Sequence, residues 1–536
     1  MSFQSISTPI SQRYFSSLVF DYLNKKLDKK YYYEYPDKSG FQNTLNKIKN
    51  YKWNREQLTS ILLNQAKSVS NTTPITLENI ELLKQDNTFT ITTGHQLCLF
   101  TGPFYVIIKI ASVIQLSYQL KKIFPEYNFV PVFWLASEDH DIEEINHFYF
   151  KDNLFKWNIS SRNNPVFTLS TKGLEEVYQQ MKSSDFFTEE FLNLFEKAYL
   201  NHNSYVDATR YLINELFGNE GIVIIDANEN KFKSQFNDVF YKDIFENKIY
   251  QDIEFTTQKL IEKKYDIQVN PRPINTFLFY DNQRFLIQKN ENQYVLKNST
   301  ITFTENELKS LLNNHPELFS PNVLLRPLYQ QSILPNIAYI GGSAELAYWL
   351  ELSNVFEKHN IFYPLIIQRP ILFFVPSSIQ NKIEKLSILY NDIFENDKNK
   401  LIQSVLDKQN LSVNLDDEKN KIQEIFNQIK KITEPIEKPI ISYVTAEEVK
   451  TLKAIENIEH KLNKSIKQKN QIIVNQIESI YDNFFPNNIM QDRVYNFSYI
   501  FNISKCSTIK EFISNTISVC TVNLDENFSF KIIKTQ

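Results

Sequence analysis

Residues 129–141 read FVPVFWLASEDHD, and this stretch decides the fold. Its first part, Phe129–Ala136, is a continuous apolar run that ends directly in an acidic string. Such runs are typical of strands buried on both faces of a parallel sheet. The acids then fall at the carboxyl edge of the sheet, where ligands gather in open α/β folds. We therefore predict an α/β core with a site at this edge.

Two other segments repeat the pattern of a predicted strand that is followed by a glycine or an acid. Residues 88–93 (TFTITT) stop at Gly94, and residues 221–227 (GIVIIDA) end in an acid. A helix to about Ile123 follows the first strand, with Thr101 as its N-cap. Strand and helix alternation predicts a Rossmann-like, doubly wound parallel sheet. We expect this core to span 1–375, with insertions at about 150–200 and 250–320.

From residue 376 the pattern becomes helical, with apolar residues three and four positions apart as in a coiled coil. The first seam runs from Ile379 to Ile393, the second from Ile422 to Ile432 with a break at Pro435, and the third from Leu452 to Ile480. We predict a coiled-coil domain over 376–481, either as an antiparallel hairpin or as a contact between two chains. The last segment, 482–536, is expected to pack back on the core.

Composition excludes several classes of protein. A chain of 536 residues is too long to fold around a single hydrophobic core, so we expect two or more structural units. A formal net charge of −4 offers no general attraction for nucleic acid. The start of the chain lacks the order of a signal peptide, and no apolar run is long enough for a bilayer. The cysteines form no CxxC pair. We expect a cytoplasmic protein without membrane or nucleic-acid partners.

The first segment that can carry chemistry is Thr92–Gln96, followed by Thr101-Gly102-Pro103. A glycine lets backbone approach a ligand, and a helix start favours anions. A tight strand-to-helix connection with capping residues is the alternative interpretation. The Rossmann glycine fingerprint and the P-loop lysine signature are both absent from the sequence.

The second segment is the acidic string Glu138-Asp139-His140-Asp141. Acids grouped at the end of a buried strand are costly unless a substrate ammonium, a metal or an acid–base pair balances them. A solvated, acid-rich helix start is the alternative. His140 and His147 lack a metal-ligand spacing and have no cysteine nearby, so we predict no metal.

The third segment begins near Arg326 and contains the double glycine Gly341-Gly342. An arginine can hold a carboxylate with two hydrogen bonds. The glycines follow an apolar strand and precede helix-forming residues, which makes a second loop-to-helix edge. Tyr348 and Trp349, taken singly, are interpreted as core residues.

Four stretches, in order, resemble one known family. They are TTGHQLCLFTGPFYVIIKI (92–110), VPVFWLASEDHDIEEINHFYF (130–150), LLRPLYQQSILPNIAYIGGSAELAYWLEL (324–352) and MQDRVYNFSYIF (490–501). They are similar to the cysteine-adding ligases of bacillithiol biosynthesis. Four long motifs in register are far more specific than any one of them.

The resemblance implies a Rossmann-like core with inserted elements, a coiled coil and a homodimer. It implies a ligase that joins the carboxyl group of cysteine to the amine of glucosaminyl-malate. Amide formation in water is uphill, so we expect a nucleotide, ATP as first choice, to activate the carboxyl group. The resemblance leaves the nucleotide and the intermediate open. The alternatives are a nucleotidyltransferase-like enzyme acting on another sugar or acid, and a non-enzymatic coiled-coil scaffold.

The resemblance also implies site residues, carried over by position. One edge of the pocket would be lined by Thr93, Gly94, His95, Gln96, Thr101 and Gly102. A second edge would be lined by Glu138, Asp139, His140 and Asp141, where an acid would receive the sugar ammonium. Glu138 would bind substrate, and the catalytic candidates are Asp139, His140 and Asp141, with His140 or Asp141 as the base. Carboxylates of malate or cysteine would be held by Arg326, Gly341 and Gly342. A junction that is structural or contacts the nucleotide would be formed by Gln491, Arg493 and Asn496.

Two positions depart from the family pattern. Ser343 and Ala344 follow Gly341-Gly342, where the family usually has more glycine. Their side chains limit how closely the backbone of this loop can approach a ligand. Gln331 stands where an acid is common, so a charge has no role there.

Overall fold

The computed structural model describes residues 3–159, 163–433 and 438–535. The chain forms two compact units: Met1–Pro376 together with Met490–Gln536, and Ser377–Ile489. The chain therefore rejoins the first unit at Met490 rather than at residue 482. Helix α22 (Gln471–Phe484) is the reason, because its buried residues continue to Phe484 within the second unit.

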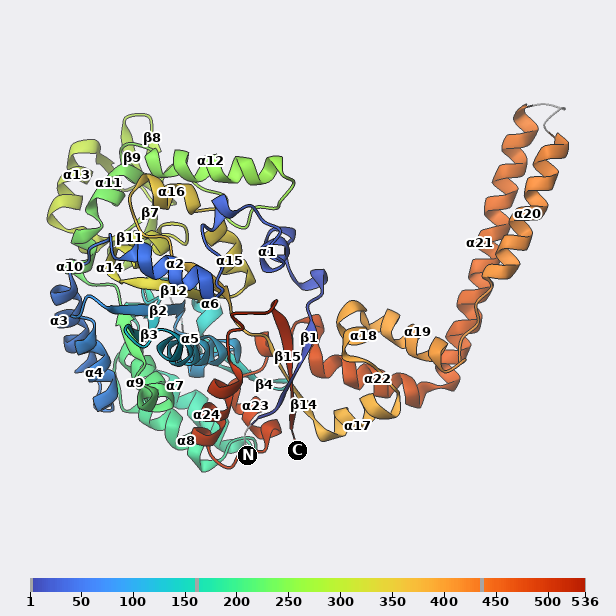
Figure 1. The fold of residues 1–536 in the computed structure, drawn as a ribbon, viewed down its shortest axis with the longest axis horizontal. Helices are drawn as coiled ribbons and strands as arrows, with labels where there is room; N and C mark the ends of the chain where they lie inside the picture. The colour runs from blue at the N-terminus through green and yellow to red at the C-terminus, as the bar shows by residue number, and fades with distance from the viewer. Residues whose placement is uncertain (1–2, 160–162, 434–437, 536) are drawn as a thin grey trace. The chain divides into compact units, whose positions relative to one another are not determined.

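The core of the first unit is a five-stranded parallel sheet with strand order β13-β12-β2-β3-β6 (Figure 1). Its strands are β2 (Thr88–His95), β3 (Asn128–Leu135), β6 (Val223–Asp226), β12 (Asn336–Gly341) and β13 (Leu365–Gln368). Strand β3 is buried along nearly its whole length, as its apolar run predicts. All five strands run in the same direction, so their carboxyl ends lie at one edge.

Helices pack on this sheet at several strands. Helix α5 (Tyr105–Ile123) packs on β2, β3 and β12, α2 (Lys38–Ile48) on β12 and β13, and α3 (Arg55–Ala66) and α4 (Pro74–Leu82) on β6. The predicted Rossmann-like α/β fold is confirmed by this arrangement.

The predicted start of helix α5 was wrong. Thr101 does not cap it, because Phe100 and Thr101 have positive φ angles of 49° and 66° within the short 3-10 helix η3 (Leu99–Thr101). The helix begins at Tyr105 with no side-chain cap. The turn is held instead by Asn496, whose Nδ2 donates to the carbonyl oxygens of Phe100 and Gly102 at 2.8 and 2.6 Å.

The last strands of the predicted core, which ends at residue 375, divide between two sheets. Strand β13 ends at Gln368, and Arg369-Pro370 turns the chain into β14 (Leu372–Pro376). Proline lacks the N–H that a sheet interior needs, so the parallel strand stops there. Strand β14 pairs with β15 (Ser529–Thr535), which also pairs with β1 (Ser5–Pro9).

The two predicted insertions contain regular structure of their own. The first holds the hairpin β4 (His147–Phe150) and β5 (Asn153–Lys156) with helices α7 (Leu174–Ser183) and α8 (Glu189–Phe195). The second holds α12 (Lys248–Glu262), α13 (Glu305–Asn314) and an antiparallel sheet in the order β10-β9-β8-β7-β11. That sheet comprises β7 (Thr276–Tyr280), β8 (Gln283–Asn290), β9 (Gln293–Leu296), β10 (Thr302–Thr304) and β11 (Phe319–Pro321).

The second unit is helical throughout its described residues. Helices α20 (Asp416–Thr433) and α21 (Lys438–Lys469) lie side by side as an antiparallel hairpin (Figure 1). Val413 N donates to Asn463 Oδ1 at 2.9 Å, and Lys419 pairs with Glu459 at 2.6 Å. The hairpin therefore closes within one chain. Pro435, where we expected the break, lies outside the described residues.

The seam predicted from Ile379 to Ile393 is not a coiled coil. It divides into two short helices, α17 (Ser377–Lys385) and α18 (Tyr390–Glu395), with Ser387 at a positive φ of 52° between them. Helices α17 and α19 (Lys398–Lys408) pack on α22, so these apolar residues form a small helical bundle. The third predicted helix is likewise two helices, α21 and α22, on either side of Asn470.

Within the described part of the chain, no helix combines the length and apolar character needed to cross a membrane.

Candidate functional site

A cavity of about 540 Å³ opens at the carboxyl edge of the parallel sheet. Its walls come from the ends of β2, β3 and β13, from α5, α14 (Leu325–Ile333) and α15 (Ser343–Leu350), from the second insertion and from Arg493 of the C-terminal segment. The basic side chains on its wall are Lys109, Arg272, Arg284, Arg326, Arg369 and Arg493. The acidic side chains are Glu138, Asp139, Glu144 and Glu345.

The end of β2 contributes Gly94, His95 and Gln96 to this cavity. A Cβ on Gly94 would lie 3.2 Å from Trp134 Cβ and 3.3 Å from the Trp134 carbonyl oxygen, so a side chain there would crowd the neighbouring strand. Burial lowers the pKa of His95 to about 3, which leaves the imidazole neutral. Its Nδ1 faces the Gln96 carbonyl oxygen at 3.2 Å and must carry the proton, so Tyr105 O–H donates to Nε2 at 2.7 Å.

The acidic string is balanced by cations from distant segments. Glu138 pairs with Lys233, which is fully buried and also donates to the Phe319 carbonyl oxygen at 2.6 Å. Asp139 pairs with Arg284, whose Nη1 lies 3.3 Å from Asp139 Oδ1. Gln96 Nε2 donates to the other carboxylate oxygen of Asp139 at 2.7 Å. Both acids are therefore fixed in place by partners within the protein.

His140 and Asp141 have different surroundings. Burial and the Arg284 guanidinium lower the pKa of His140. Arg284 Nη1 donates to His140 Nδ1 at 3.4 Å, which assigns the proton to Nε2 and makes that nitrogen a donor. Asp141 is exposed and caps the short helix α6 (Ile142–Ile145) by accepting from Glu144 N at 3.3 Å. Asp141 does not line the cavity, contrary to the expectation from the sequence.

Glu144 lines the cavity in the place that Asp141 was expected to hold. Burial raises its pKa, as do the neighbouring carboxylates of Asp141 and Asp139. No described cation forms an ion pair with Glu144, in contrast to Glu138, Asp139 and Glu345. It is the carboxylate at this end that remains available to a ligand.

The opposite end of the cavity is built around Arg326. Its guanidinium donates to Tyr348 O–H and lies 5.9 Å from the centre of the Tyr339 ring. No described carboxylate forms an ion pair with it. Arg369 lies at the same end and is paired with the buried Asp492 at 2.5 Å.

The double glycine differs in its two positions. Gly342 borders the cavity, but its N–H donates to Glu345 Oε2 at 2.8 Å and is not open to a ligand. Gly341 ends β12 and is not among the lining residues; a Cβ there would lie 2.9 Å from Glu345 Cβ. Gly341 is thus needed for close packing against Glu345, whereas a Cβ on Gly342 would make ordinary contacts, 3.7 Å from Glu345 Oε2 and 3.8 Å from Arg369 Nε.

The remaining predicted residues lie outside the cavity wall. Thr93 Oγ1 donates to the Ile340 carbonyl oxygen at 2.7 Å and ties β2 to β12. Gln491 holds the Phe374 backbone through two hydrogen bonds of 2.7 and 3.0 Å, and Asn496 holds the loop containing Thr101 and Gly102. These residues are structural in this arrangement, and of the predicted junction Arg493 alone lines the cavity.

The sequence interpretation missed several wall residues, and two of them carry a detectable signal. Lys109 is a single lysine in the apolar helix run YVIIKIASVI, and Glu345 lies at the third position of the helix after Gly341-Gly342. Lys233 and Arg284 carry no such signal, because their partners are 95 and 145 residues away in sequence.

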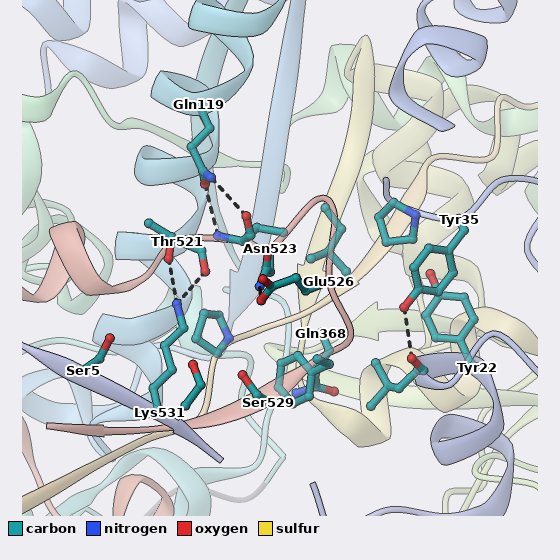
Figure 2. A pocket seen from close by; sticks show the side chains of 17 residues that line it. Ser5, Tyr22, Tyr35, Gln119, Gln368, Thr521, Asn523, Glu526, Ser529 and Lys531 are labelled. Carbon is teal, nitrogen blue, oxygen red and sulfur yellow. Dashed lines mark hydrogen bonds between the residues drawn. The ribbon is translucent and has the colours of Figure 1, made fainter. Parts of the chain in front are cut away.

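A second cavity, of about 260 Å³, lies between β1, β15 and the loop before β15 (Figure 2). Its lysine is fully used by the protein: Lys531 Nζ donates to the carbonyl oxygens of Val519 and Thr521 and to Thr521 Oγ1 at 2.7–2.9 Å. Gln119 is likewise held at both ends by the Val522 backbone. No polar side-chain atom on this wall is both buried and without a partner among the described residues.

No group of three or more potential ligands for a metal ion occurs within residues 3–159, 163–433 and 438–535.

Comparison with known proteins places this geometry in a family. The N-terminal Rossmann-like domain described as bacillithiol biosynthesis BshC matches residues 1–370, and the C-terminal coiled-coil domain of the same description matches residues 372–522. The chain is 40% identical over 492 residues to a protein of Flavobacterium johnsoniae named "Putative cysteine ligase BshC", covering 90% of this chain and 92% of that protein.

Proteins with the same name extend the similarity to other bacteria. One from Christiangramia forsetii is 38% identical, with 90% of this chain and 92% of the relative covered. One from Bacillus cereus is 28% identical, with 94% and 95% covered. The match spans both units and the four stretches that form the cavity and its supports, so the chain belongs to the BshC family of bacillithiol biosynthesis.

Proposed function

We propose that the cavity joins the carboxyl group of cysteine to the amine of glucosaminyl-malate, the final amide-forming step of bacillithiol synthesis. The observation that carries the proposal is the division of charge across the cavity. Glu144 lacks an ion-pair partner at one end, and Arg272, Arg326 and Arg493 lack carboxylate partners among the described residues. A substrate with one amine and several carboxylates complements this wall.

The amine is received at the acidic end. Gln96 Oε1 is buried and has no hydrogen-bond partner among the described residues, so it can accept from a substrate N–H. Glu144 supplies a carboxylate whose raised pKa makes it a stronger base than an ordinary glutamate. We assign to Glu144 the removal of the ammonium proton, which frees the nitrogen to attack the cysteine carbonyl carbon.

Asp139 and His140 supply the other polar groups around the amine. Asp139 is held by Gln96 and Arg284 and keeps the Gln96 side chain in place. His140 presents Nε2–H as a donor, which suits a hydroxyl or carbonyl oxygen of the substrate. The earlier assignment of Asp141 as the base is replaced, since its carboxylate caps α6.

The carboxylates of the substrates are received at the arginine end. Arg326 can form two parallel hydrogen bonds to one carboxylate, and Arg493 adds a second unpaired cation. A nucleotide, ATP as first choice, would convert the cysteine carboxylate oxygen into a leaving group. The unpaired arginines are suited to its phosphates as well as to carboxylates.

The reaction itself is the decisive test. Purified protein is incubated with glucosaminyl-malate, cysteine and either ATP, CTP or no nucleotide, and thiol-labelled products are read by mass spectrometry. Formation of bacillithiol with one nucleotide supports the proposal and identifies the activating group. Transfer of a nucleotide without cysteine, or no product from folded protein, would contradict it and favour the nucleotidyltransferase-like enzyme or the scaffold.

We further propose that the protein acts as a homodimer in the cytoplasm. Several apolar residues of the hairpin stay exposed in the single chain, among them Ile425 at 54%, Val449 at 60% and Ile458 at 49%. A second copy would cover them. Light scattering at working concentration checks this: a mass of one chain would contradict the dimer.

A further inference from the structure

Lys109 is a cation enclosed by the core. It lies on α5 in an otherwise apolar run, and its side chain is 2% exposed. Despite this burial it borders the cavity at the carboxyl edge of the sheet. A buried ammonium is costly unless acceptors satisfy it, so its hydrogen bonds account for its presence.

Two acceptors for Lys109 come from a strand and a helix that border the cavity. Nζ donates to the Gly94 carbonyl oxygen at 2.5 Å and to Glu345 Oε2 at 2.7 Å. The same Glu345 carboxylate accepts from Gly342 N at 2.8 Å and from Tyr339 O–H at 2.5 Å. Lys109 therefore joins the end of β2 to the first turn of α15.

An ammonium has three N–H donors, and Lys109 uses two of them. The third has no acceptor among the described residues. Lys531 provides a contrast within the same unit, since all three of its donors are used. It donates to the Val519 carbonyl oxygen and to two oxygens of Thr521 (Figure 2). Lys531 is thus satisfied by the protein, and Lys109 is not.

The surroundings of Lys109 are positive. Burial lowers the pKa of Lys109, the Glu345 carboxylate opposes this, and the Arg326 and Arg369 guanidinium groups add to the lowering. Glu345 balances Lys109 and Asp492 balances Arg369, while Arg326 has no described acidic partner. One cation in excess remains at this corner, which favours an anion.

We propose that the third N–H of Lys109 donates to an anionic oxygen of the substrate, a carboxylate or a phosphate, in the corner between Arg326 and Arg369. The inference rests on the proposed function for the identity of that anion. It assigns a binding residue outside the four candidate groups of the sequence.

Electrostatics keep the supporting pair ionised. Burial alone would raise the pKa of Glu345, but the Lys109 ammonium and the Gly342 N–H outweigh it and hold that pKa at about 2. The ionised Glu345 in turn stabilises the charged lysine. With the lysine charged, the pair presents one remaining donor to the cavity.

The test measures binding without turnover. Calorimetric titrations with L-malate and, separately, with ATP are made on the wild type and on Lys109→Met/Glu345→Gln, which removes both charges of the pair together. The matched control is Lys531→Met, which removes a lysine whose three donors are all used within the protein. We expect the double variant to bind one of the two anions about ten- to a hundredfold more weakly, with the control close to the wild type.

Weaker binding of malate identifies the anion as a carboxylate, and weaker binding of ATP identifies it as a phosphate. Unchanged binding of both anions, no binding of either by the wild type, or an equal loss in Lys531→Met would overturn the inference. A crystal structure of the wild type with the bound anion decides the matter if the double variant does not fold. Lys109 Nζ farther than about 3.5 Å from every anion oxygen would refute the contact.

These measurements separate the two proposals. A protein that binds the anion through Lys109 and yet forms no bacillithiol contradicts the proposed function alone. A double variant that ligates and binds as well as the wild type contradicts the role of Lys109 alone.

Discussion

At the acidic end of the cavity, Glu138 and Asp139 each lie against a cation, Lys233 and Arg284, that a distant segment supplies. At the arginine end, Arg326 lies against Tyr348 and near the Tyr339 ring, and no described carboxylate pairs with it. Paired charges stabilise the fold, because removing one partner leaves the other buried without compensation. An unpaired charge contributes to binding instead. Substitutions at the two ends should therefore affect different measurements.

The largest effect is expected from Lys233→Met at the acidic end. It leaves Glu138 without its cation, and breaking such a buried pair costs about 3–5 kcal/mol. The thermal midpoint of unfolding should fall clearly. Lys233→Met/Glu138→Gln is the control, and it should recover part of the loss. A single variant that melts with the wild type would contradict the balancing role of Lys233.

Next in size is Arg326→Met at the arginine end. No described acid loses a partner, so the thermal midpoint should stay close to that of the wild type. The loss of a buried cation facing a substrate anion should lower kcat/KM by more than about a hundredfold, equivalent to roughly 3 kcal/mol. Steady-state kinetics read this directly. A large loss of stability with unchanged kcat/KM would show that Arg326 supports the fold and does not bind the substrate.

Glu144→Gln tests a cavity-lining acid that forms no ion pair with any cation in the described part of the chain. As a general base it should contribute about a hundredfold to the rate. A base acts in its ionised form, so wild-type activity should fall as the pH decreases through the raised pKa of Glu144. In Glu144→Gln the remaining activity should lose this acidic limb. A pH profile of kcat/KM with an unchanged limb would exclude Glu144 as the base.

The smallest effect is expected from Asp141→Ala. The side chain caps α6, and loss of an N-cap costs about 1 kcal/mol. Activity should remain near that of the wild type, since Asp141 does not line the cavity. Ligation assays and the thermal midpoint together check this. Complete loss of ligation in a folded Asp141→Ala protein would restore Asp141 as a catalytic candidate.

The predicted edge of the sheet contains residues that the structure brings together and residues that it separates. Gly94, Gln96, Glu138, Asp139 and Arg326 line one cavity, although their motifs are far apart in sequence. Parallel strands explain this, because all their carboxyl ends meet at one edge. The sequence could not tell whether a polar residue is structural or binds a ligand, as for Asp141, Gln491 and Asn496. A polar side chain that caps a helix or holds a loop has the same composition as one that binds a ligand.

The sequence did not predict which positive groups balance the acidic string. A string of acids after a buried strand correctly indicated that some positive group must balance it, but a substrate, a metal and an acid–base pair all satisfied that argument. The balancing groups are Lys233, on the helix after β6, and Arg284, in the second insertion. Neither position has a local pattern that names its partner.

The sequence by itself determined the parallel α/β core, the edge at which the site lies and the helical region after residue 376, because apolar periodicity is a local property of the chain. Tertiary structure alone decided which charges are paired. Glu138, Asp139 and Glu345 are held by cations from elsewhere, while Glu144 and Arg326 remain for a ligand. Ion pairs across 95 to 236 residues depend on where the folded backbone brings two side chains, and no local pattern encodes that distance.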